Sequence, residues 1–368
     1  MMKTLFTVPR LTKADLATLD RIAGIRAEVG VYVRDAHVWT GPLARLLRAK
    51  ASQGSNSIEG HDLSLDDTLA VLDGHAVEGD VQLELDQAAV QGYRDAMAYL
   101  LVLVGDDHFA YDVGVLRALH RLLMHPYREK LIELKLLNTP GHQDPRPGLW
   151  RRGHISVGEY EAPDIAVAVG LVADLVESLN SGCHSSAIVC AAMAHLNYVS
   201  IHPHSDGNGR MSRALQTLVL ARGSGDLAPE FVGVEEWLGA HRKAYYDALT
   251  EARRKGALSW VRFCLQAHLD QAESVLTNAQ DARHKGRILA ELCEAARIND
   301  RAVTALWDAA AGRRVTNASY RLQEGLDRQA ATYDLRLLDA AGLLTLVGKG
   351  GGAHYVAGDK LTAALKQA

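Results

Sequence analysis

One feature limits the possible folds of this chain more than any other. It is an apolar stretch of helix length, followed by a proline and two glycines. Residues 185–201 are apolar over several turns, which is the pattern of a buried helix. Pro203 lacks the backbone N–H that a helix needs and therefore stops it. The glycine-containing loop that follows leads into a new helix, which we expect to begin near Arg210. The sequence therefore predicts two consecutive helices joined by a tight loop.

Most of the remaining sequence also favours helices, and strand signals are few. Residues 11–29, for example, place Leu and Ile at helical spacing. The clearest strand signal lies in residues 148–163, where apolar and polar side chains alternate between loops that contain proline and glycine. The alternating residues are His154, Ile155, Ser156 and Val157. We therefore expect a mainly α fold with a short β-hairpin on its surface.

Length, composition and charge narrow the class of protein. A chain of 368 residues is too long for one ordinary core, so two or three domains are expected. A hydrophobic fraction of 48% and a charged fraction of 23% are typical of a globular protein. The formal net charge of −4 excludes a general polyanion binder, so any contact with nucleic acid would be local. Apolar runs are too short to predict a membrane-spanning helix or a signal peptide.

The four cysteines are scattered along the chain and show no spacing typical of a metal site. We expect them to be reduced thiols in the core of a cytoplasmic protein. They are Cys183, Cys190, Cys264 and Cys293.

The end of the chain, residues 281–368, has a pattern of its own. Three helical patterns, the last two separated by a break near Asp327, precede two short strands joined by a glycine-rich turn. This order resembles a winged helix-turn-helix domain, in which residues 330–344 would supply the recognition helix. The segment holds thirteen Lys and Arg against ten Asp and Glu, a small basic excess. Contact with DNA therefore stays open, and a helical dimerisation module is the alternative.

The loop after Pro203 combines residue types that favour a phosphate site. Gly207 and Gly209 allow backbone conformations in which N–H groups face outward, and the N-terminus of the following helix attracts anions. Arg210 and Arg213 lie three residues apart on one face of that helix and can both reach back over the loop. The segment is therefore suited to hold a chain of phosphates.

Two further residues of the loop indicate chemistry beyond binding. Asp206 places a carboxylate where phosphates would repel it, and a Mg²⁺ ion between the two resolves that conflict. His202 lies at the mouth of the loop, where it is the natural general base. The alternative is an ordinary turn with solvated charges and a helix-capping His202. Each residue alone fits that interpretation, but the full set does not.

The segment "HPHSDGNGR" followed by "MSR" resembles the signature of the Fic family, His-Pro-Phe-x-Asp/Glu-Gly-Asn-Gly-Arg-x-x-Arg. Family members transfer AMP from ATP onto a protein hydroxyl. The resemblance implies that His202 deprotonates the target hydroxyl and that Asp206 holds Mg²⁺. It assigns the phosphates of ATP to Gly207, Asn208, Gly209, Arg210 and Arg213. The one departure is His204 in place of Phe, which we expect to be a neutral, partly buried spacer with a hydrogen-bonded nitrogen.

A second segment, far upstream, resembles the inhibitory helix motif of the same family, Ser/Thr-x-x-x-Glu-Gly/Asn. Its residues here are Ser55, Glu59 and Gly60. In the family the glutamate pairs with the second arginine of the signature, which is Arg213 in this chain. Because a carboxylate competes with phosphate for the same donors, the resemblance implies inhibition within one chain.

Two other segments resemble parts of the family that contact the substrates. The hairpin over 148–163 resembles the flap, whose edge pairs with the target segment through His154, Ile155, Ser156 and Val157. The helix "HRKAYYDAL" resembles one that packs near the adenine, which implies a nucleoside contact by Tyr245 or Tyr246. A purely structural hairpin and core aromatic residues are the alternatives.

We therefore predict an N-terminal helical region over residues 1–105, a Fic catalytic core over 106–275 and a winged helix-turn-helix domain over 281–368. The predicted activity is ATP- and Mg²⁺-dependent transfer of AMP to a target protein or to the chain itself. Removal of AMP, transfer of another nucleotidyl or phosphoryl group, and DNA-binding regulation with a nucleotide-sensing Fic domain are the alternatives. Whether the chain forms a homodimer stays open.

Overall fold

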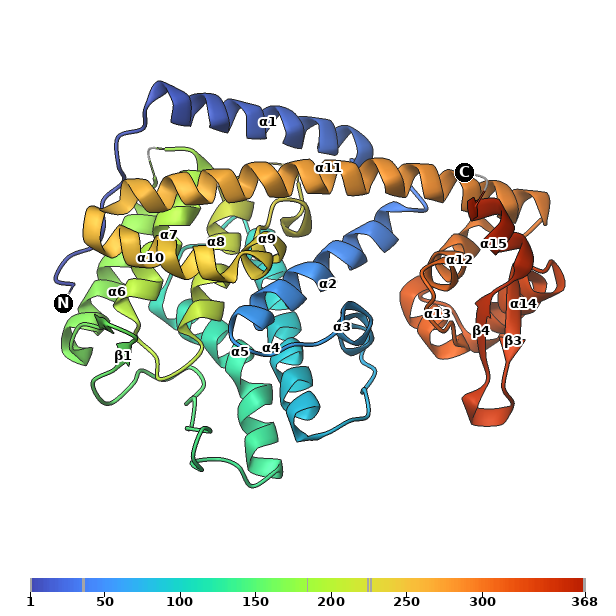
Figure 1. The fold of residues 1–368 in the computed structure, drawn as a ribbon, viewed down its shortest axis with the longest axis horizontal. Coiled ribbons are helices and arrows are strands. Elements are labelled where there is room, and N and C mark those ends of the chain that lie inside the picture. Colours follow the sequence, from blue (N-terminus) through green and yellow to red (C-terminus); the bar gives the residue numbers. More distant parts are fainter. Residues whose placement is uncertain (1, 35–36, 184, 224, 226, 367–368) are drawn as a thin grey trace. The chain divides into compact units, whose positions relative to one another are not determined.

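The computed structural model describes residues 2–34, 37–183, 185–223, 225 and 227–366. Its contacts divide the chain into two compact units. The first comprises Met1–Ala27 and Leu47–Ser274, and the second comprises Glu28–Leu46 and Val275–Ala368. Three helices contribute residues to both units, namely α1 (Lys13–Val33), α2 (Thr40–Ile58) and α11 (Ala257–Ala295) (Figure 1).

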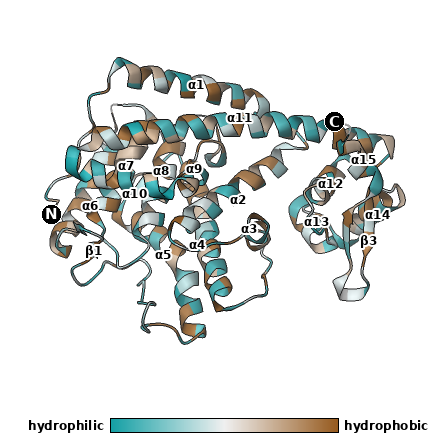
Figure 2. Ribbon diagram, viewed as in Figure 1, coloured by the Kyte–Doolittle hydropathy of each residue, from teal (hydrophilic) through white to brown (hydrophobic). Residues whose placement is uncertain are grey.

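Helices form most of the first unit, which confirms the mainly α fold (Figure 1). Brown and teal residues alternate along them in Figure 2, as expected of helices with one apolar and one polar face. Besides the parts of α1, α2 and α11, they are α3 (Leu65–Leu72), α4 (Val81–Val104), α5 (Val113–Glu133), α6 (Ile165–Asn180), α7 (Ala187–Ile201), α8 (Asn208–Gly223), α9 (Glu235–Ala240) and α10 (Arg242–Lys255).

Helix α7 lies in the core of this unit. Every residue from Ile188 to Ile201 is buried, and the helix packs against α6 and α8. The predicted buried helix is therefore confirmed. The second helix, α8, begins at Asn208, close to the predicted start. The two helices thus hold the loop of residues 202–207 between their ends.

The predicted hairpin is also present, but its strands are short. β1 (Ser156–Val157) pairs antiparallel with β2 (Tyr160–Glu161). Gly158 begins the two-residue turn with a φ of 58°, a conformation that glycine adopts without steric cost. The remainder of residues 148–163 forms the two arms that lead into and out of the hairpin.

The expectation of four reduced cysteines is wrong for two of them. Cys183 and Cys190 are joined by a disulfide, with Cα atoms 5.8 Å apart. Cys190 lies in the buried helix α7, and Cys183 is exposed in the segment before it. Their separation in the chain therefore does not indicate the pairing. Cys264 and Cys293 are buried free thiols, as predicted.

The second unit contains, after α11, the helices α12 (Val303–Ala310), α13 (Asn317–Glu324) and α14 (Arg328–Ala340), the strands β3 (Leu344–Val347) and β4 (His354–Ala357), and α15 (Asp359–Lys366). β3 and β4 form an antiparallel hairpin in which Leu344 lies opposite Ala357. The predicted break near Asp327 is the start of α14, because the Asp327 side chain caps that helix by accepting a hydrogen bond from the Ala330 N–H. The order from α12 to β4 is the one predicted from the sequence, whereas the final helix α15 was not predicted.

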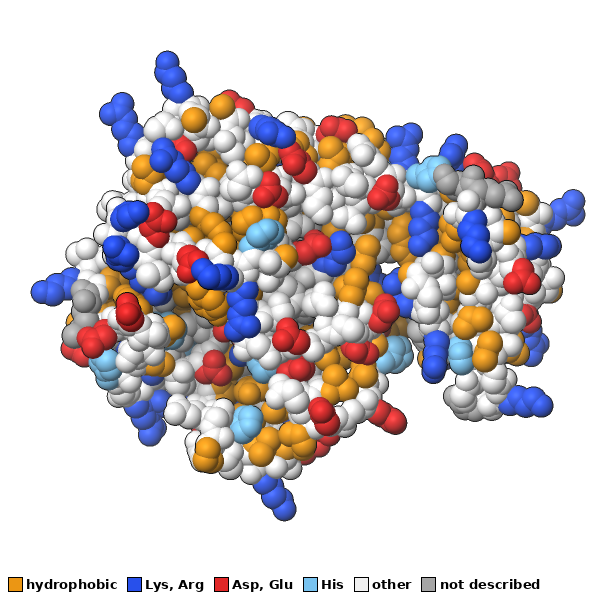
Figure 3. All heavy atoms as spheres, viewed as in Figure 1, with side chains coloured by type: hydrophobic (Ala, Val, Ile, Leu, Met, Phe, Trp, Pro, Cys, Tyr) orange, Lys and Arg blue, Asp and Glu red, His pale blue; other side chains and the backbone are white. Residues whose placement is uncertain are grey.

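The surface of the described residues carries both signs of charge. On the face in Figure 3, basic and acidic side chains are interspersed among the described residues, in agreement with the small net charge. Among those residues, no helix combines the length and the apolar character that are needed to cross a bilayer.

A buried carboxyl joins α8 to the start of α9. The Thr217 hydroxyl donates to Glu235, and the Val234 N–H donates to the second carboxyl oxygen at 2.9 Å. Burial raises the pKa of Glu235, so the folded protein keeps this proton to a higher pH than the unfolded chain does. Because the pKa is higher in the folded than in the unfolded chain, ionisation costs stability as the pH rises above about 4.5.

We therefore expect Glu235→Gln to stabilise the protein at neutral pH, with a gain that disappears as the pH falls toward 4.5. Glutamine can keep both hydrogen bonds, because its oxygen accepts from the Val234 N–H and its amide donates to Thr217. Thermal melting over a pH series measures the effect. Glu236→Gln is the matched control, since Glu236 pairs with Lys50 at the surface at 3.0 Å. A parent protein that gains stability over Glu235→Gln with rising pH would contradict this assignment.

Candidate active site

His202 directly follows α7 and has a backbone conformation that is rare outside glycine. Its φ is 51° and its ψ is 57°, and its N–H donates to the Tyr198 carbonyl at 3.1 Å. Its Nδ1 lies 3.3 Å from the Val199 carbonyl, so Nδ1 carries the proton and Nε2 has the free lone pair. Burial lowers the pKa of His202 to about 4. The imidazole is therefore neutral at physiological pH and able to accept a proton through Nε2.

His204 is fully buried, and both of its ring nitrogens have partners. Nδ1 lies 2.8 Å from the Leu149 carbonyl, and Nε2 lies 2.8 Å from the Tyr198 hydroxyl. Burial, with His120 beside it, holds the pKa of His204 well below its usual range. The predicted hydrogen-bonded nitrogen is present, and burial is complete where partial burial was expected. That His204 is a spacer and not a second base stays a prediction.

His120 of α5 is a site residue that sequence reasoning missed. Its ring stacks on that of His204, with centroids 3.5 Å apart and planes 5° from parallel. Nε2 lies 2.9 Å from the Asp206 carbonyl, and Nδ1 accepts from the Gly148 N–H at 2.9 Å. His120 therefore ties the loop to the arm that precedes the hairpin. His120 is one of two histidines in an amphipathic helix, so the sequence contains no signal of such a role.

The loop is held in shape by its own side chains. Asn208 accepts from the His204 N–H at 3.0 Å and donates to the His204 carbonyl at 2.9 Å. The Asn208 side chain is therefore engaged within the loop, and its role at the phosphates stays a prediction. Gly207 has a φ of 76°, and a Cβ there would lie 2.5 Å from the Met124 sulfur. Asp206 is exposed, and its Oδ1 accepts from the Gly207 N–H at 2.5 Å.

Arg210 and Arg213 bring two positive charges to the start of α8 in buried positions. Each is 1% exposed. Nε and Nη1 of Arg210 and Nη1 of Arg213 are buried without a hydrogen-bond partner. A buried guanidinium with unpaired donors is costly, and such a group in a native structure calls for an explanation. A bound anion supplies one, so the residues present fit a polyphosphate.

Glu59 directly follows α2 and forms an ion pair with Arg213, which lies 154 residues further along the chain. The Glu59 Oε1 lies 2.7 Å from the Arg213 Nη2. Ser55 completes the contact, since its hydroxyl accepts from the Arg213 Nε at 2.9 Å and its carbonyl accepts from Nη2 at 2.8 Å. Burial alone would raise the pKa of Glu59, but the Arg213 and Arg210 guanidiniums hold it below its usual range. The carboxylate is therefore ionised and occupies part of the Arg213 donor fork.

Glycines allow this close approach. A Cβ on Gly209 would lie 2.2 Å from the Glu59 Oε1 and 3.2 Å from the Arg213 Nη1. Gly60 follows Glu59 with a φ of 88°, in the left-handed region that ends helices. The predicted inhibitory residues thus lie together at the predicted arginine, and their inhibitory role stays a prediction.

The two tyrosines predicted near the nucleoside lie in different surroundings. Tyr245 is 1% exposed, and its hydroxyl lies 2.9 Å from the His195 Nε2. A nucleoside contact by Tyr245 is therefore not supported, because its ring and hydroxyl are both taken up in the core. Tyr246 is 40% exposed, and its hydroxyl donates to the Ile58 carbonyl at 3.1 Å. Of the two tyrosines, Tyr246 therefore remains the candidate for the predicted nucleoside contact, and it lies beside the end of α2.

The hairpin presents an accessible edge. His154, Ser156 and Val157 are exposed, and Ile155 is half-buried. The sheet of β1 and β2 has two strands only, so the outer edge of β1 has no partner strand within it. The predicted flap residues therefore lie where an extended peptide could add a strand.

The described residues contain no group of three or more His, Cys, Asp or Glu side chains that could hold a metal ion. A Mg²⁺ ion at Asp206 would therefore depend on oxygens from a bound phosphate for most of its ligands, as Mg²⁺ sites at nucleotides commonly do. The exposed Asp206 carboxylate at the start of α8 fits such an arrangement.

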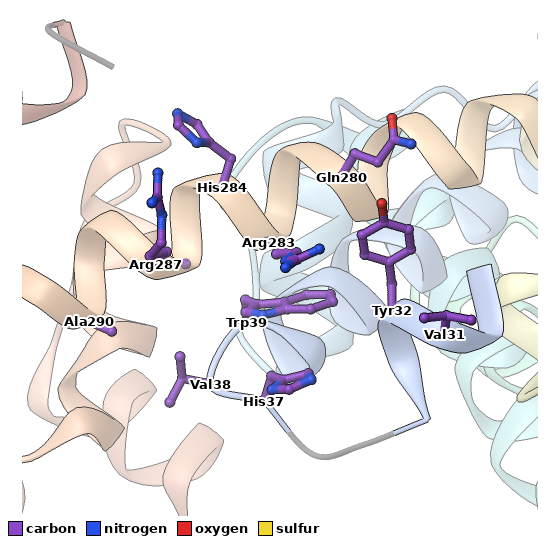
Figure 4. A pocket seen from close by; sticks show the side chains of 11 residues that line it. Val31, Tyr32, His37, Val38, Trp39, Gln280, Arg283, His284, Arg287 and Ala290 are labelled. Carbon is purple, nitrogen blue, oxygen red and sulfur yellow. The ribbon is translucent and has the colours of Figure 1, made fainter. Parts of the chain in front are cut away.

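A separate pocket of about 810 Å³ lies within the second unit (Figure 4). Arg283, His284 and Arg287 of α11 and the rings of Tyr32, His37 and Trp39 line it. None of the predicted site residues lies in this pocket, so it is distinct from the loop between α7 and α8.

Comparison with known sequences agrees with the motif. The profile of the Fic/DOC family matches residues 110–220. Protein adenylyltransferase Fic of Aedes aegypti is 30% identical over 225 residues, which are 59% of this chain and 40% of that relative. Protein adenylyltransferase fic-1 of Caenorhabditis elegans is 28% identical over 212 residues, which are 56% of this chain and 37% of that relative. The chain thus spans about two fifths of the length of these relatives.

Comparison with solved structures shows the same fold. A Fic family protein from Desulfovibrio desulfuricans G20 has a TM-score of 0.60 at 24% identity and covers 96% of this chain and 98% of its own. Fic-1 of Caenorhabditis elegans has a TM-score of 0.58 at 21% identity and covers 73% of this chain and 74% of its own. At these identities the likeness concerns the fold alone.

Proposed function

Because the chain belongs to the Fic/DOC family, we propose that it is a protein adenylyltransferase, which moves AMP from ATP to a hydroxyl of a target protein. The relatives named above carry that activity in their names. One observation supports the proposal most directly: a neutral histidine with a free Nε2 lies at the start of the loop, and two buried arginines with unpaired donors lie in the first turns of the helix that follows it.

The proposed reaction uses the residues of the loop in separate roles. The first N–H groups of α8 have no partner within the helix and, with Arg210 and Arg213, bind the phosphates of ATP. The target hydroxyl attacks the α-phosphorus, a new O–P bond forms, and the bond from the α-phosphorus to pyrophosphate breaks. The His202 Nε2 takes the proton of the hydroxyl. Asp206 would hold Mg²⁺, which neutralises charge on the phosphates when bound.

Glu59 is proposed to restrain this reaction. Its carboxylate already pairs with Arg213, and a phosphate of ATP needs the same donors. The nucleotide is then left in a pose that does not favour attack on the α-phosphorus. Because Glu59 and Arg213 belong to one chain, the restraint needs no second protein.

The second unit is proposed to be a winged helix-turn-helix domain. The support is the order of α12, α13 and α14 followed by the hairpin of β3 and β4. In addition, Val315 forms an isolated antiparallel β-bridge with Tyr355 of β4. The charges on α14 are mixed, since Arg328 and Arg336 alternate with Asp334 and Asp339. No observation favours DNA over a protein as its partner, so the proposal concerns the fold of this unit.

Mass spectrometry of the Glu59→Gly chain after incubation with ATP and Mg²⁺ tests the activity. We expect a covalent AMP adduct on a hydroxyl side chain, and label from ATP labelled at the α-phosphate but not at the γ-phosphate. Label from the γ-phosphate would replace the proposal with a kinase. The absence of any adduct on the chain or on proteins of a cell lysate would reject nucleotide transfer.

A further inference from the structure

Arg151 lies in the arm that leads into the hairpin and is 4% exposed. All three nitrogens of its guanidinium donate to backbone carbonyls. Nε donates to the His202 carbonyl at 2.9 Å, Nη1 donates to the Gly153 carbonyl at 2.5 Å, and Nη2 donates to the Pro163 carbonyl. The Arg151 N–H also donates to the Pro203 carbonyl at 3.0 Å. One residue thus bonds both arms of the hairpin and the backbone of the predicted base.

The positions of these carbonyls explain what the contacts hold in place. Gly153 and Pro163 flank the hairpin on either side, so Arg151 closes its base. The His202 carbonyl belongs to a residue in a left-handed conformation, which few residues adopt unless the surroundings fix them. A planar guanidinium offers its donors in fixed directions, so the three carbonyls are set relative to one another.

Arg151 also brings a positive charge close to His202. The acceptors of its side-chain hydrogen bonds are carbonyls and not carboxylates, and the acidic groups that act on its charge are Asp164 and Tyr160. Other charged or titratable groups that act on His202 are Arg253 of α10, Glu59 directly after α2, and the neighbouring His204. Burial is the main cause of the lowered pKa of His202. Both arginines add to it, and the hydrogen bond to Val199 and the charge of Glu59 oppose it.

We propose that Arg151 is a positioning residue that fixes the hairpin to the backbone of His202, so that a hydroxyl held on the β1 edge meets the His202 Nε2 in one geometry. The inference rests on the proposed function for its catalytic meaning. Its structural content, the coupling of the hairpin to His202, does not depend on which group is transferred.

The test compares Arg151→Gln, Arg151→Lys and Arg152→Gln in the Glu59→Gly chain. Arg152 is the matched control, because it is the next residue and is exposed. Single-turnover AMP incorporation is measured against pH and against ATP concentration. We expect Arg151→Gln to lower the rate by about tenfold or more, because small displacements of reacting groups cost rate steeply. The ATP concentration that gives half the maximal rate should stay near the parent value.

The pH dependence of the rate separates the effect of the Arg151 charge from the effect of its hydrogen bonds. Loss of a positive charge raises the pKa of His202, so the acidic limb of the rate profile should move to higher pH in Arg151→Gln. Arg151→Lys keeps the charge but not the three-way fork, so its limb should stay near that of the parent while its rate falls. If Arg151 were merely structural, its substitution would change the melting temperature but would leave the acidic limb of the rate profile in place. Equal rates and equal limbs in Arg151→Gln and Arg152→Gln would overturn the inference.

A measurement that does not depend on AMP transfer tests the inference separately from the proposed function. Proton NMR of the His202 ring, assigned with His202→Ala, follows its titration in the full chain. We expect an upward shift of the His202 pKa in Arg151→Gln that Arg152→Gln lacks. If the Glu59→Gly chain transfers no AMP, the proposed function fails while this shift still supports the coupling. Should Arg151→Gln not fold, Arg151→Lys carries the rate comparison, and a parent-like rate in it would overturn the positioning role.

Discussion

Replacing Glu59 by glycine is expected to raise AMP incorporation by about 10- to 100-fold. The Glu59 carboxylate holds the Arg213 Nη2 at 2.7 Å, and Arg213 is buried, so a phosphate must displace a charge-assisted hydrogen bond to reach this donor. Such bonds contribute about 1.5–3 kcal/mol. Each 1.36 kcal/mol corresponds to a factor of ten in rate. The initial rate of incorporation from α-labelled ATP measures the change.

Two variants show whether the charge of Glu59 is the cause. Glu59→Gln keeps the size of the side chain and removes the charge, so we expect an intermediate rise. Asp62→Asn removes an exposed acid three residues further on and should leave the rate unchanged. A Glu59→Gly chain that labels no faster than Asp62→Asn would show that the contact between Glu59 and Arg213 does not restrain the reaction.

The sequence sufficed for the parts of the site that lie within a few residues of one another. The stop at Pro203, the glycine loop and the two arginines all act through local backbone geometry, so their arrangement follows from spacing along the chain. Glu59 lies 154 residues from Arg213, and only the resemblance to a family motif connected the two. Helical spacing near Glu59 would otherwise indicate an ordinary helix end.

The parts that the sequence could not predict depend on packing between distant elements. His120 and Arg151 bond to backbone carbonyls and N–H groups, which every residue has, so no partner residue type marks them. Tyr245 and Tyr246 are adjacent on one helix and therefore point about 100° apart, so packing buries one and exposes the other. Only the positions of α2 and α7 determine which of the two tyrosines is buried and which is exposed.

Replacing His202 by alanine in the Glu59→Gly chain is expected to lower AMP incorporation by about 10²- to 10⁴-fold, the usual contribution of a general base. The structure provides the reason, since His202 is neutral, donates through Nδ1 to Val199 and leaves Nε2 free. ATP binding should persist, because the buried arginines are untouched. Binding of a fluorescent ATP analogue, measured beside incorporation, separates loss of the base from loss of the nucleotide site.

His204→Phe is the matched control, because it removes a second imidazole two residues away. Both His204 nitrogens are engaged, with Leu149 and Tyr198, so they are not available to accept the proton of a substrate. A phenyl ring can keep the stack on His120 but loses the hydrogen bond to the Leu149 carbonyl and leaves the buried Tyr198 hydroxyl without this partner, at a cost of about 1–3 kcal/mol for the hydroxyl. We therefore expect a lower melting temperature with AMP incorporation retained below it. A large loss of incorporation in folded His204→Phe, together with an active His202→Ala, would show that the roles of the two histidines are reversed.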